Sequence, residues 1–316
     1  MSERLDRLAK QKKQKRLILK LLFVLVLISA MLAVAAAYRA VTGKLSVMRM
    51  EVEESKEGVL EETLTGTAMV VQEETVLRSP ADGRFENLVR EKERVRRGAI
   101  LGRLYTESGT ESYDVTAPIA GVVLYQTDGL ETVMVPSKLG DLHPQMFAYS
   151  IHVVRGVENL LHKGDAFAKI VNNLKPTGLV VKTEDTADPL ADGQEVGVRY
   201  KNLDLGTARV ISIERGNDYT LVGLIMSGFV MEVADRRSIP VELVIRRYEG
   251  IIVPTRALTT KAGRLGVYCL RKETVVFKEV QLVARKAGHS VVRGLDAGEY
   301  VVTTPDLVKE GMVMRR

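Results

Sequence analysis

The sequence predicts a mainly β protein in which several small β-domains follow one N-terminal transmembrane helix. Three observations lead to this prediction. Residues 21–38 form an uncharged apolar stretch. From about residue 60 onward, short β-rich runs alternate with Gly, Asp, Asn and Pro, a pattern typical of β-barrels and β-sandwiches. Finally, a unit made of a Pro-x-x-Gly turn, a strand and a Gly-centred turn occurs twice.

The apolar stretch, LLFVLVLISAMLAVAAAY, is extended upstream by residues 17–19 and is long enough to cross a bilayer core, which takes about 20 residues. We therefore predict a cytoplasmic basic tail at 1–16 and a transmembrane anchor at 17–39, with the lipid bilayer as one partner. The positive-inside rule places the later residues outside the cytoplasm. A cleaved signal peptide remains the alternative, because small residues at 33–37 offer cleavage sites.

The excess of basic charge lies entirely in the N-terminal segment. Residues 1–20 contain eight basic and two acidic side chains, whereas the other 296 contain 38 of each, for a net charge of +6. A nucleic-acid-binding protein needs the excess on its folded part, so no nucleic-acid partner is expected. Aromatic residues make up 5% of the chain and tryptophan is absent, which disfavours surfaces that stack bases or sugars.

The repeated unit supplies the predicted structural turns. Proline restricts φ and glycine has no Cβ, so a Pro-x-x-Gly segment turns the chain tightly between strands. Two such units are expected to pair face to face into a flattened barrel. The predicted turn residues of the two copies are Pro80, Gly83, Gly98, Pro118, Gly121 and Gly164.

These half-motifs resemble the biotinyl/lipoyl-type fold, and residues 60–312 resemble the HlyD-like membrane fusion protein (periplasmic adaptor) family. DGQEVGV at 192–198 with GTARVISI at 206–213 is similar to the adaptor β-barrel. IVPTRAL at 252–258 with VVRGLDAGEYVV at 291–302 is similar to the membrane-proximal domain. The resemblance implies four parts after the anchor: a linker and first membrane-proximal strand (40–64), a lipoyl-like barrel-sandwich hybrid (65–173), a β-barrel (174–249) and a membrane-proximal β-domain (250–316).

The hairpin between the half-motifs, residues 105–114, differs from the hairpin of biotinyl or lipoyl carrier domains and from that of long adaptors. It contains no lysine, so biotin or lipoyl attachment is impossible there and no cofactor is expected. It is also too short for the coiled coil of long adaptors, since ten residues rarely sustain a helix in water. With Gly109 at its centre, we expect a tight β-connection and a short form of the family without a docking tip for an outer-membrane channel.

The second half-motif instead contains an insertion at residues 127–161. Its apolar side chains have the spacing of one or two helical turns packed on a barrel. Two interpretations remain open: a lid over the barrel, which we favour, and a partner-docking element. The residues concerned are Leu139, Leu142, Met146 and Phe147.

Catalytic signatures are missing from the sequence. It has no Gly-x-Ser-x-Gly, phosphate-loop, Cys-x-x-Cys or His-Glu-x-x-His motif. His143, His152 and His162 do not share a helical face, so no metal site is expected. The single cysteine, Cys269, lies in an apolar run and is interpreted as a buried core residue. The chain is therefore not expected to be an enzyme.

The resemblance implies a non-catalytic adaptor subunit of an efflux or secretion transporter, acting through protein contacts. Its expected partner is an inner-membrane transporter or another envelope protein, and homo-oligomer formation stays open. The alternative is an envelope or cell-division-associated scaffold that reuses the adaptor fold, which the short hairpin motivates.

Overall fold

The regular structure described between residues 50 and 313 consists of β-strands and short 3₁₀ helices, which confirms the mainly β prediction. The structure is a computed structural model that describes residues 29–31, 33, 34, 50–107, 109, 111–156, 160–184 and 190–313. Most of the predicted anchor, 17–39, lies outside the described residues; its described residues 29–31, 33 and 34 are helical. Within the described ranges, no helix has the length and apolar character needed to span a membrane.

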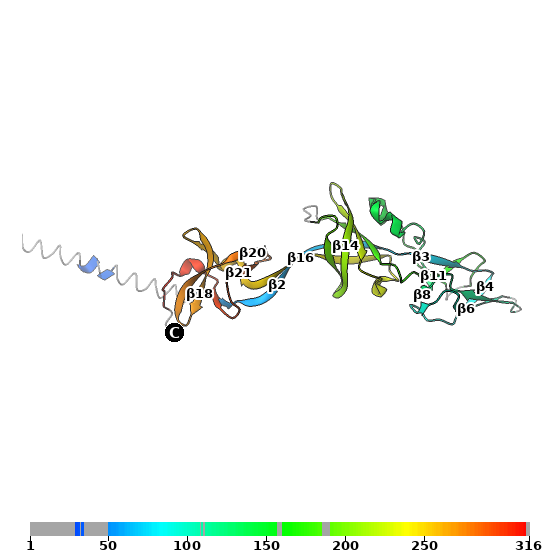
Figure 1. The fold of residues 1–316 in the computed structure, drawn as a ribbon, viewed down its shortest axis with the longest axis horizontal. Coiled ribbons are helices and arrows are strands. Elements are labelled where there is room, and N and C mark those ends of the chain that lie inside the picture. The colour runs from blue at the N-terminus through cyan, green and yellow to red at the C-terminus, as the bar shows by residue number, and fades with distance from the viewer. Residues whose placement is uncertain are drawn as a thin grey trace, which may run out of the picture. The chain divides into compact units, whose positions relative to one another are not determined.

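The chain divides into two compact units, which are described separately. The larger is Glu61–Arg247, and the smaller combines the residues up to Leu60 with Tyr248–Arg316. Two long strands, β2 (Lys56–Val71) and β16 (Ser238–Pro254), belong partly to each unit. The larger unit is therefore an insertion into the sequence of the smaller one (Figure 1).

A closed barrel of six strands forms one part of the larger unit. The strands follow the order β13-β14-β15-β12-β2-β16, and β13 also pairs with β16. Closure removes exposed sheet edges. The range predicted for the barrel, 174–249, omits its strand β2, which precedes the half-motifs in the sequence. Besides β2 and β16, the barrel consists of β12 (Gly178–Thr183), β13 (Glu195–Tyr200), β14 (Leu203–Arg215) and β15 (Thr220–Met226).

The barrel strands β12 and β15, together with the last four residues of β2, are buried on both faces. Successive side chains of a strand point to opposite faces, so Val70 and Val181 fill the barrel interior while Met69 and Val180 face outward. Both sets are nevertheless buried. The outward set must therefore be covered by another part of the chain.

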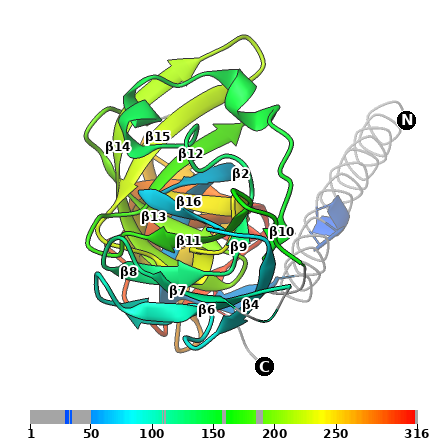
Figure 2. The same ribbon diagram turned by 90° about the vertical axis from the view of Figure 1, so that its right-hand side faces the viewer.

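A two-layer sandwich forms the other part of the larger unit. One sheet has the order β3-β11-β8-β5 and the other β4-β6-β7 (Figure 2). Phe85 and Phe167 meet in its core with ring centroids 4.9 Å apart. Its strands are β3 (Glu74–Arg78), β4 (Gly83–Asn87), β5 (Arg94–Val95), β6 (Ile100–Thr106), β7 (Ser112–Thr116), β8 (Gly121–Leu124) and β11 (Ala166–Val171).

The turns of the two half-motifs bind each other. Ser79, just before the first Pro-x-x-Gly turn, donates from its N–H to the carbonyl of Asp165 (2.9 Å) and accepts from the N–H of Gly164 (2.8 Å). Ala117, just before the second, pairs in the same way with Gly98 and the residue after it (2.8 and 2.9 Å). Each half thus holds the turn of the other, which confirms the predicted face-to-face pairing.

The glycines of these turns are needed for two different reasons. Gly98 and Gly164 have φ of 80° and 93°, where a Cβ is disfavoured. Gly83 and Gly121 do not have positive φ; they allow close approach of a neighbouring strand. A Cβ on Gly121 would lie 2.3 Å from the carbonyl oxygen of Val171, and one on Gly83 would be equally crowded.

The hairpin between the half-motifs is short, as predicted. β6 pairs directly with β7, and Tyr105 lies opposite Ser112 at its end. The N–H of Thr106 donates to the carbonyl of Glu111 (3.1 Å), which closes the connection. Ser108 and Thr110 lie outside the described residues.

The smaller unit contains a five-stranded sheet of order β1-β22-β18-β17, with β19 also paired to β18. The pair β20–β21 extends the end of β16. Val253, Val267 and Val301 lie in its core. Its strands are β1 (Val52–Glu54), β17 (Leu258–Lys261), β18 (Arg264–Arg271), β19 (Thr274–Glu279), β20 (Gln281–Lys286), β21 (His289–Arg293) and β22 (Tyr300–Val302).

Cys269, on β18, lies in this core and is 3% exposed. Burial, aided by the charge of Glu299, raises the pKa of its thiol to about 11. Because the thiolate is the reactive form, we expect a chromogenic disulfide reagent at pH 8 to modify Cys269 at least about 100-fold more slowly in the folded than in the urea-unfolded protein. Equal rates in the two states would contradict this core position.

Candidate functional site

The insertion covers the outward face of β2, β12 and β15. It contains two short 3₁₀ helices, η1 (Pro136–Gly140) and η2 (Pro144–Phe147), which Figure 2 shows beside β12 and β15. Leu139, Leu142 and Met146 are buried against the barrel, and Phe147 is partly buried there. This is the packing expected of a lid. A docking role for these four side chains would require them to leave the barrel, and stays a prediction.

Two barrel glycines make room for this lid. A Cβ on Gly178 would lie 2.4 Å from Cδ1 of Leu139, and one on Gly223 would lie 2.6 Å from its carbonyl oxygen. The same carbonyl accepts a hydrogen bond from Oγ of Ser212 (2.6 Å). A glycine within the apolar strand run at 220–226 is the sequence signal that could have indicated a close-packed partner.

Replacing Gly223 with valine is expected to push η1 off the barrel, because the new Cβ would overlap both the Leu139 carbonyl and the Ser212 hydroxyl. Overpacking of this kind costs about 1–3 kcal/mol. The free energy of unfolding and the rate of proteolysis within 127–161 measure the effect. Gly228→Val is the matched control, since nothing lies within 4 Å of its Cβ position. Equal proteolysis of the two variants would contradict the packing.

A buried cluster of five charged side chains lies beside the lid. Arg237 contacts Glu74 (2.5 Å) and Asp128 (2.9 Å). Lys169 contacts Asp128 (2.8 Å), Glu74 (3.0 Å) and Glu131 (3.5 Å). All five side chains are less than 10% exposed. We call this set of two cations and three carboxylates the charge cluster.

The charge cluster joins three parts of the larger unit. Glu74 and Lys169 come from β3 and β11 of the sandwich. Asp128 lies in the insertion immediately after β9 (Gln126–Thr127), which pairs with β10 (Val154–Arg155). Arg237 precedes β16 and donates to the carbonyl of Val70 on β2 (3.0 Å). The cluster thus fixes the sandwich and the lid to the barrel.

The members of the cluster stabilise one another's charges. Burial alone would raise the pKa of Asp128, but the charge and hydrogen bonds of Arg237, helped by Lys169, lower it below its usual value. Burial acts against the charge of Arg237 too, and Glu74 and Asp128 outweigh it and raise the pKa of the guanidinium. With its groups buried and paired, the cluster is suited to structure and not to catalysis.

No metal-binding group forms around His143, His152 and His162, all of which the structure describes. In the parts of the chain that the structure describes, no group of three or more His, Cys, Asp or Glu is arranged to hold a metal ion. The Nδ1 of His162 lies 3.9 Å from Asp82, and both side chains are exposed. His143 accepts a hydrogen bond from the N–H of Gln145 at the start of η2 (3.3 Å).

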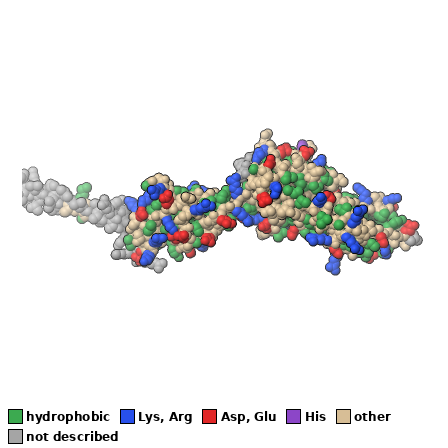
Figure 3. Space-filling view, viewed as in Figure 1, with side chains coloured by type: hydrophobic (Ala, Val, Ile, Leu, Met, Phe, Trp, Pro, Cys, Tyr) green, Lys and Arg blue, Asp and Glu red, His purple; other side chains and the backbone are tan. Residues whose placement is uncertain are grey.

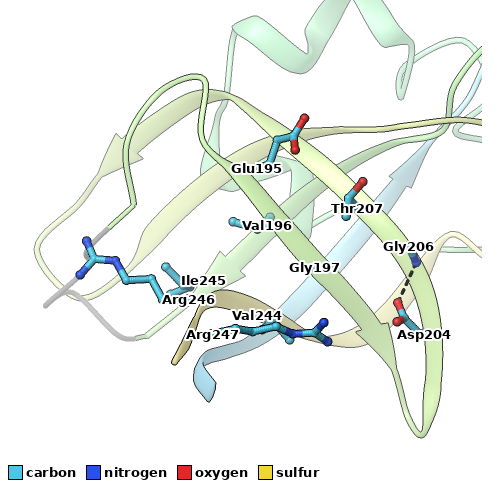
Figure 4. Close-up of a pocket in the computed structure, with 10 residues that line it drawn as sticks. All are labelled: Glu195, Val196, Gly197, Asp204, Gly206, Thr207, Val244, Ile245, Arg246 and Arg247. Carbon is cyan, nitrogen blue, oxygen red and sulfur yellow. Dashed lines mark hydrogen bonds between the residues drawn. The ribbon is translucent and has the colours of Figure 1, made fainter. Parts of the chain in front are cut away.

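A shallow groove of about 300 Å³ lies on the barrel where β13 and β16 diverge (Figure 4). It mixes apolar and charged side chains, and Figure 4 shows Glu195 and Arg246 pointing apart. Oδ1 of Asp204 accepts a hydrogen bond from the N–H of Gly206 (2.9 Å). The lining brings together no nucleophile and base, so the groove does not indicate catalysis.

Comparisons with known proteins agree with the sandwich geometry. Residues 74–172 match the family model described as RND related, barrel-sandwich hybrid domain. No curated protein matches the chain in sequence.

Solved structures found by similarity include ZneB from Cupriavidus metallidurans (12% identity, TM-score 0.34, covering 85% of this chain and 95% of that one). A second is MacA from Actinobacillus actinomycetemcomitans (13% identity, TM-score 0.34, covering 79% of this chain and 98% of that one). A third is the membrane fusion protein Spr0693 from Streptococcus pneumoniae R6 (12% identity, TM-score 0.30, covering 60% of this chain and 100% of that one).

TM-scores this low carry no argument about the fold. The identification of a barrel-sandwich hybrid therefore depends on the family model and on the paired half-motifs. Both describe the same segment, since the family model begins at the first residue of β3 and ends one residue after β11. Residues 74–172 are therefore similar to an RND-related barrel-sandwich hybrid domain, the domain type that the resemblance to the HlyD-like membrane fusion protein family predicts.

Proposed function

We propose that this chain is a membrane-anchored, extracytoplasmic adaptor-like subunit of an efflux or secretion transporter, acting through protein contacts without catalysis. The observation that carries the proposal is the RND-related barrel-sandwich hybrid at residues 74–172, joined to a closed β-barrel. Residues 17–39 would tether it in the inner membrane, with the N-terminus in the cytoplasm. The partner would be an inner-membrane transporter or another envelope protein.

The packing of the larger unit supports this role. An adaptor that works by contact must keep its surfaces in fixed relation when a partner binds. The lid and the charge cluster supply that rigidity by tying the sandwich to the barrel. Buried ion pairs of this kind are costly to break, so the joint is expected to stay closed.

A structural scaffold of the envelope or of cell division is the second candidate. The short β6–β7 connection favours it, because the direct pairing of these strands leaves no room for a coiled-coil reach between the half-motifs. A scaffold would need lateral contacts, including contacts between copies of this chain, and no transporter.

Deleting the gene and measuring export and cell shape separates the two candidates. The adaptor role predicts lower tolerance to exported compounds, restored by the full chain, with normal shape and septation. A septation or shape defect with unchanged export would instead support the scaffold.

The proposed location has its own test. A C-terminal tag should fractionate with the inner membrane and be digested by protease added to cells whose outer barriers have been opened. An N-terminal tag should be protected. Protection of the C-terminal tag would contradict an extracytoplasmic body.

A further inference from the structure

Residues 90–97 (REKERVRR) form a run of mixed charge. In the folded chain the two acids of this run accept hydrogen bonds, whereas its four arginines have no side-chain partner among the residues that the structure describes. Oε2 of Glu91 accepts a hydrogen bond from the N–H of Tyr125 (2.9 Å). Oε2 of Glu93 accepts from the backbone N–H of Arg90 (3.1 Å). Both carboxylates therefore accept hydrogen bonds from backbone N–H groups of the sandwich.

Four of the five cations of the same run face solvent. Lys92 alone is paired, with Asp235 (2.9 Å). The other four have exposed side chains, and none makes a side-chain hydrogen bond or ion pair with any residue that the structure describes. We call the set the basic edge; it consists of Arg90, Arg94, Arg96 and Arg97.

The basic edge lies along the end of a sheet. β5, which contains Arg94, is the last strand of the sheet β3-β11-β8-β5 and pairs only with β8. Large apolar side chains on either side of residues 90–97 in the sequence are also exposed: Leu88 is 65% and Ile100 is 46% exposed. The N–H of Leu88 donates to the carbonyl of Leu101 (2.8 Å), which brings together the two backbone segments that carry these apolar side chains. Figure 3 shows Lys and Arg side chains standing out from this part of the surface, near β8.

We propose that the basic edge binds an extended acidic segment of a protein partner, with carboxylates on the arginines and apolar side chains on Leu88 and Ile100. The proposal rests on the proposed function, that the chain acts through protein contacts, and adds the chemistry of the partner.

Three features favour this occupant. All four free cations are arginine, whose planar fork binds a carboxylate through two hydrogen bonds. An edge strand offers unpaired backbone groups to an added strand. The exposed apolar side chains beside the charges match a strand that alternates acidic and apolar residues.

The test uses the purified full chain in mild detergent and a fluorescent peptide of four Glu-Val repeats, with Gln-Val and Lys-Val peptides for comparison. We expect the Glu-Val peptide to bind most tightly, with an affinity that falls as salt is added. Changing all four arginines of the basic edge to glutamine should weaken binding about 10- to 100-fold.

The matched control changes four other exposed cations to glutamine: Lys175, Arg285, Arg293 and Lys309. It removes the same charge and should alter affinity less than about twofold. Equal loss in both variants would mean that net charge alone matters and would overturn the proposal. So would binding of anionic phospholipid vesicles without binding of the peptide, because the ligand would then be a membrane surface.

This result is separable from the proposed function. The peptide assay needs no transporter, so it can succeed or fail whatever the gene deletion shows. If deletion abolishes export but the basic-edge variant exports normally and binds the peptide like the unmodified protein, the adaptor role stands and this inference fails.

Discussion

Replacing Arg237 with methionine is expected to lower the free energy of unfolding by about 3–5 kcal/mol, because it leaves buried carboxylates without their guanidinium partner. Arg237 is 5% exposed and holds Glu74, Asp128 and the carbonyl of Val70 together. Urea unfolding of the full chain in mild detergent measures the loss.

The matched control is Arg209→Met. Arg209 pairs with Glu195 at 3.7 Å, but both side chains are more than 60% exposed, and such pairs contribute little. If the two variants lose stability equally, the charge cluster does not join the sandwich to the barrel.

The same contacts give stability a defined dependence on pH. The pKa of Asp128 is lowered in the folded protein, so its ion pairs stabilise the fold above the ordinary aspartate pKa of about 3.9. That contribution is lost as pH falls through the lowered value. Arg237→Met should therefore reduce the stability difference between pH 7 and pH 3, and an unchanged difference would argue against this linkage.

Replacing Gly121 with alanine is expected to destabilise the sandwich by about 1–3 kcal/mol, because the added methyl cannot be accommodated without moving backbone. Its Cβ would lie 2.3 Å from the carbonyl oxygen of Val171 and 2.6 Å from Cγ2 of Ile170. Thermal and urea unfolding of the full chain provide the measurement.

Gly228→Ala supplies the comparison for this substitution, since no atom lies within 4 Å of its Cβ position. At a compatible site alanine is neutral or slightly stabilising. A Gly121→Ala variant as stable as Gly228→Ala would mean that β8 and β11 are not packed as closely as described.

The local signals of the sequence were sufficient for the sandwich. Its turn residues carry their own conformational restrictions, so the Pro-x-x-Gly and Gly-centred turns could be placed from the sequence and found paired across the two halves. The short β6–β7 hairpin could be predicted because its length alone rules out a coiled coil.

The charge cluster could not be predicted, because its members are far apart in sequence. Asp128 and Arg237 are separated by 109 residues, and each looks like a surface residue in its own segment. The same limit applies to the barrel, whose strand β2 comes from before the half-motifs. In the run at 90–97 the sequence shows mixed charge, and only the hydrogen bonds of Glu91 and Glu93 separate the acids from the arginines.

Affinity purification of the full chain from membranes in mild detergent tests the adaptor role most directly. The tagged protein should recover an inner-membrane transporter, identified by mass spectrometry, in amounts comparable to its own. The recovery should be lost when the sandwich is destabilised by Gly121→Ala and kept with Gly228→Ala. Recovery of the protein alone, as a monomer under the same conditions, would contradict the adaptor role.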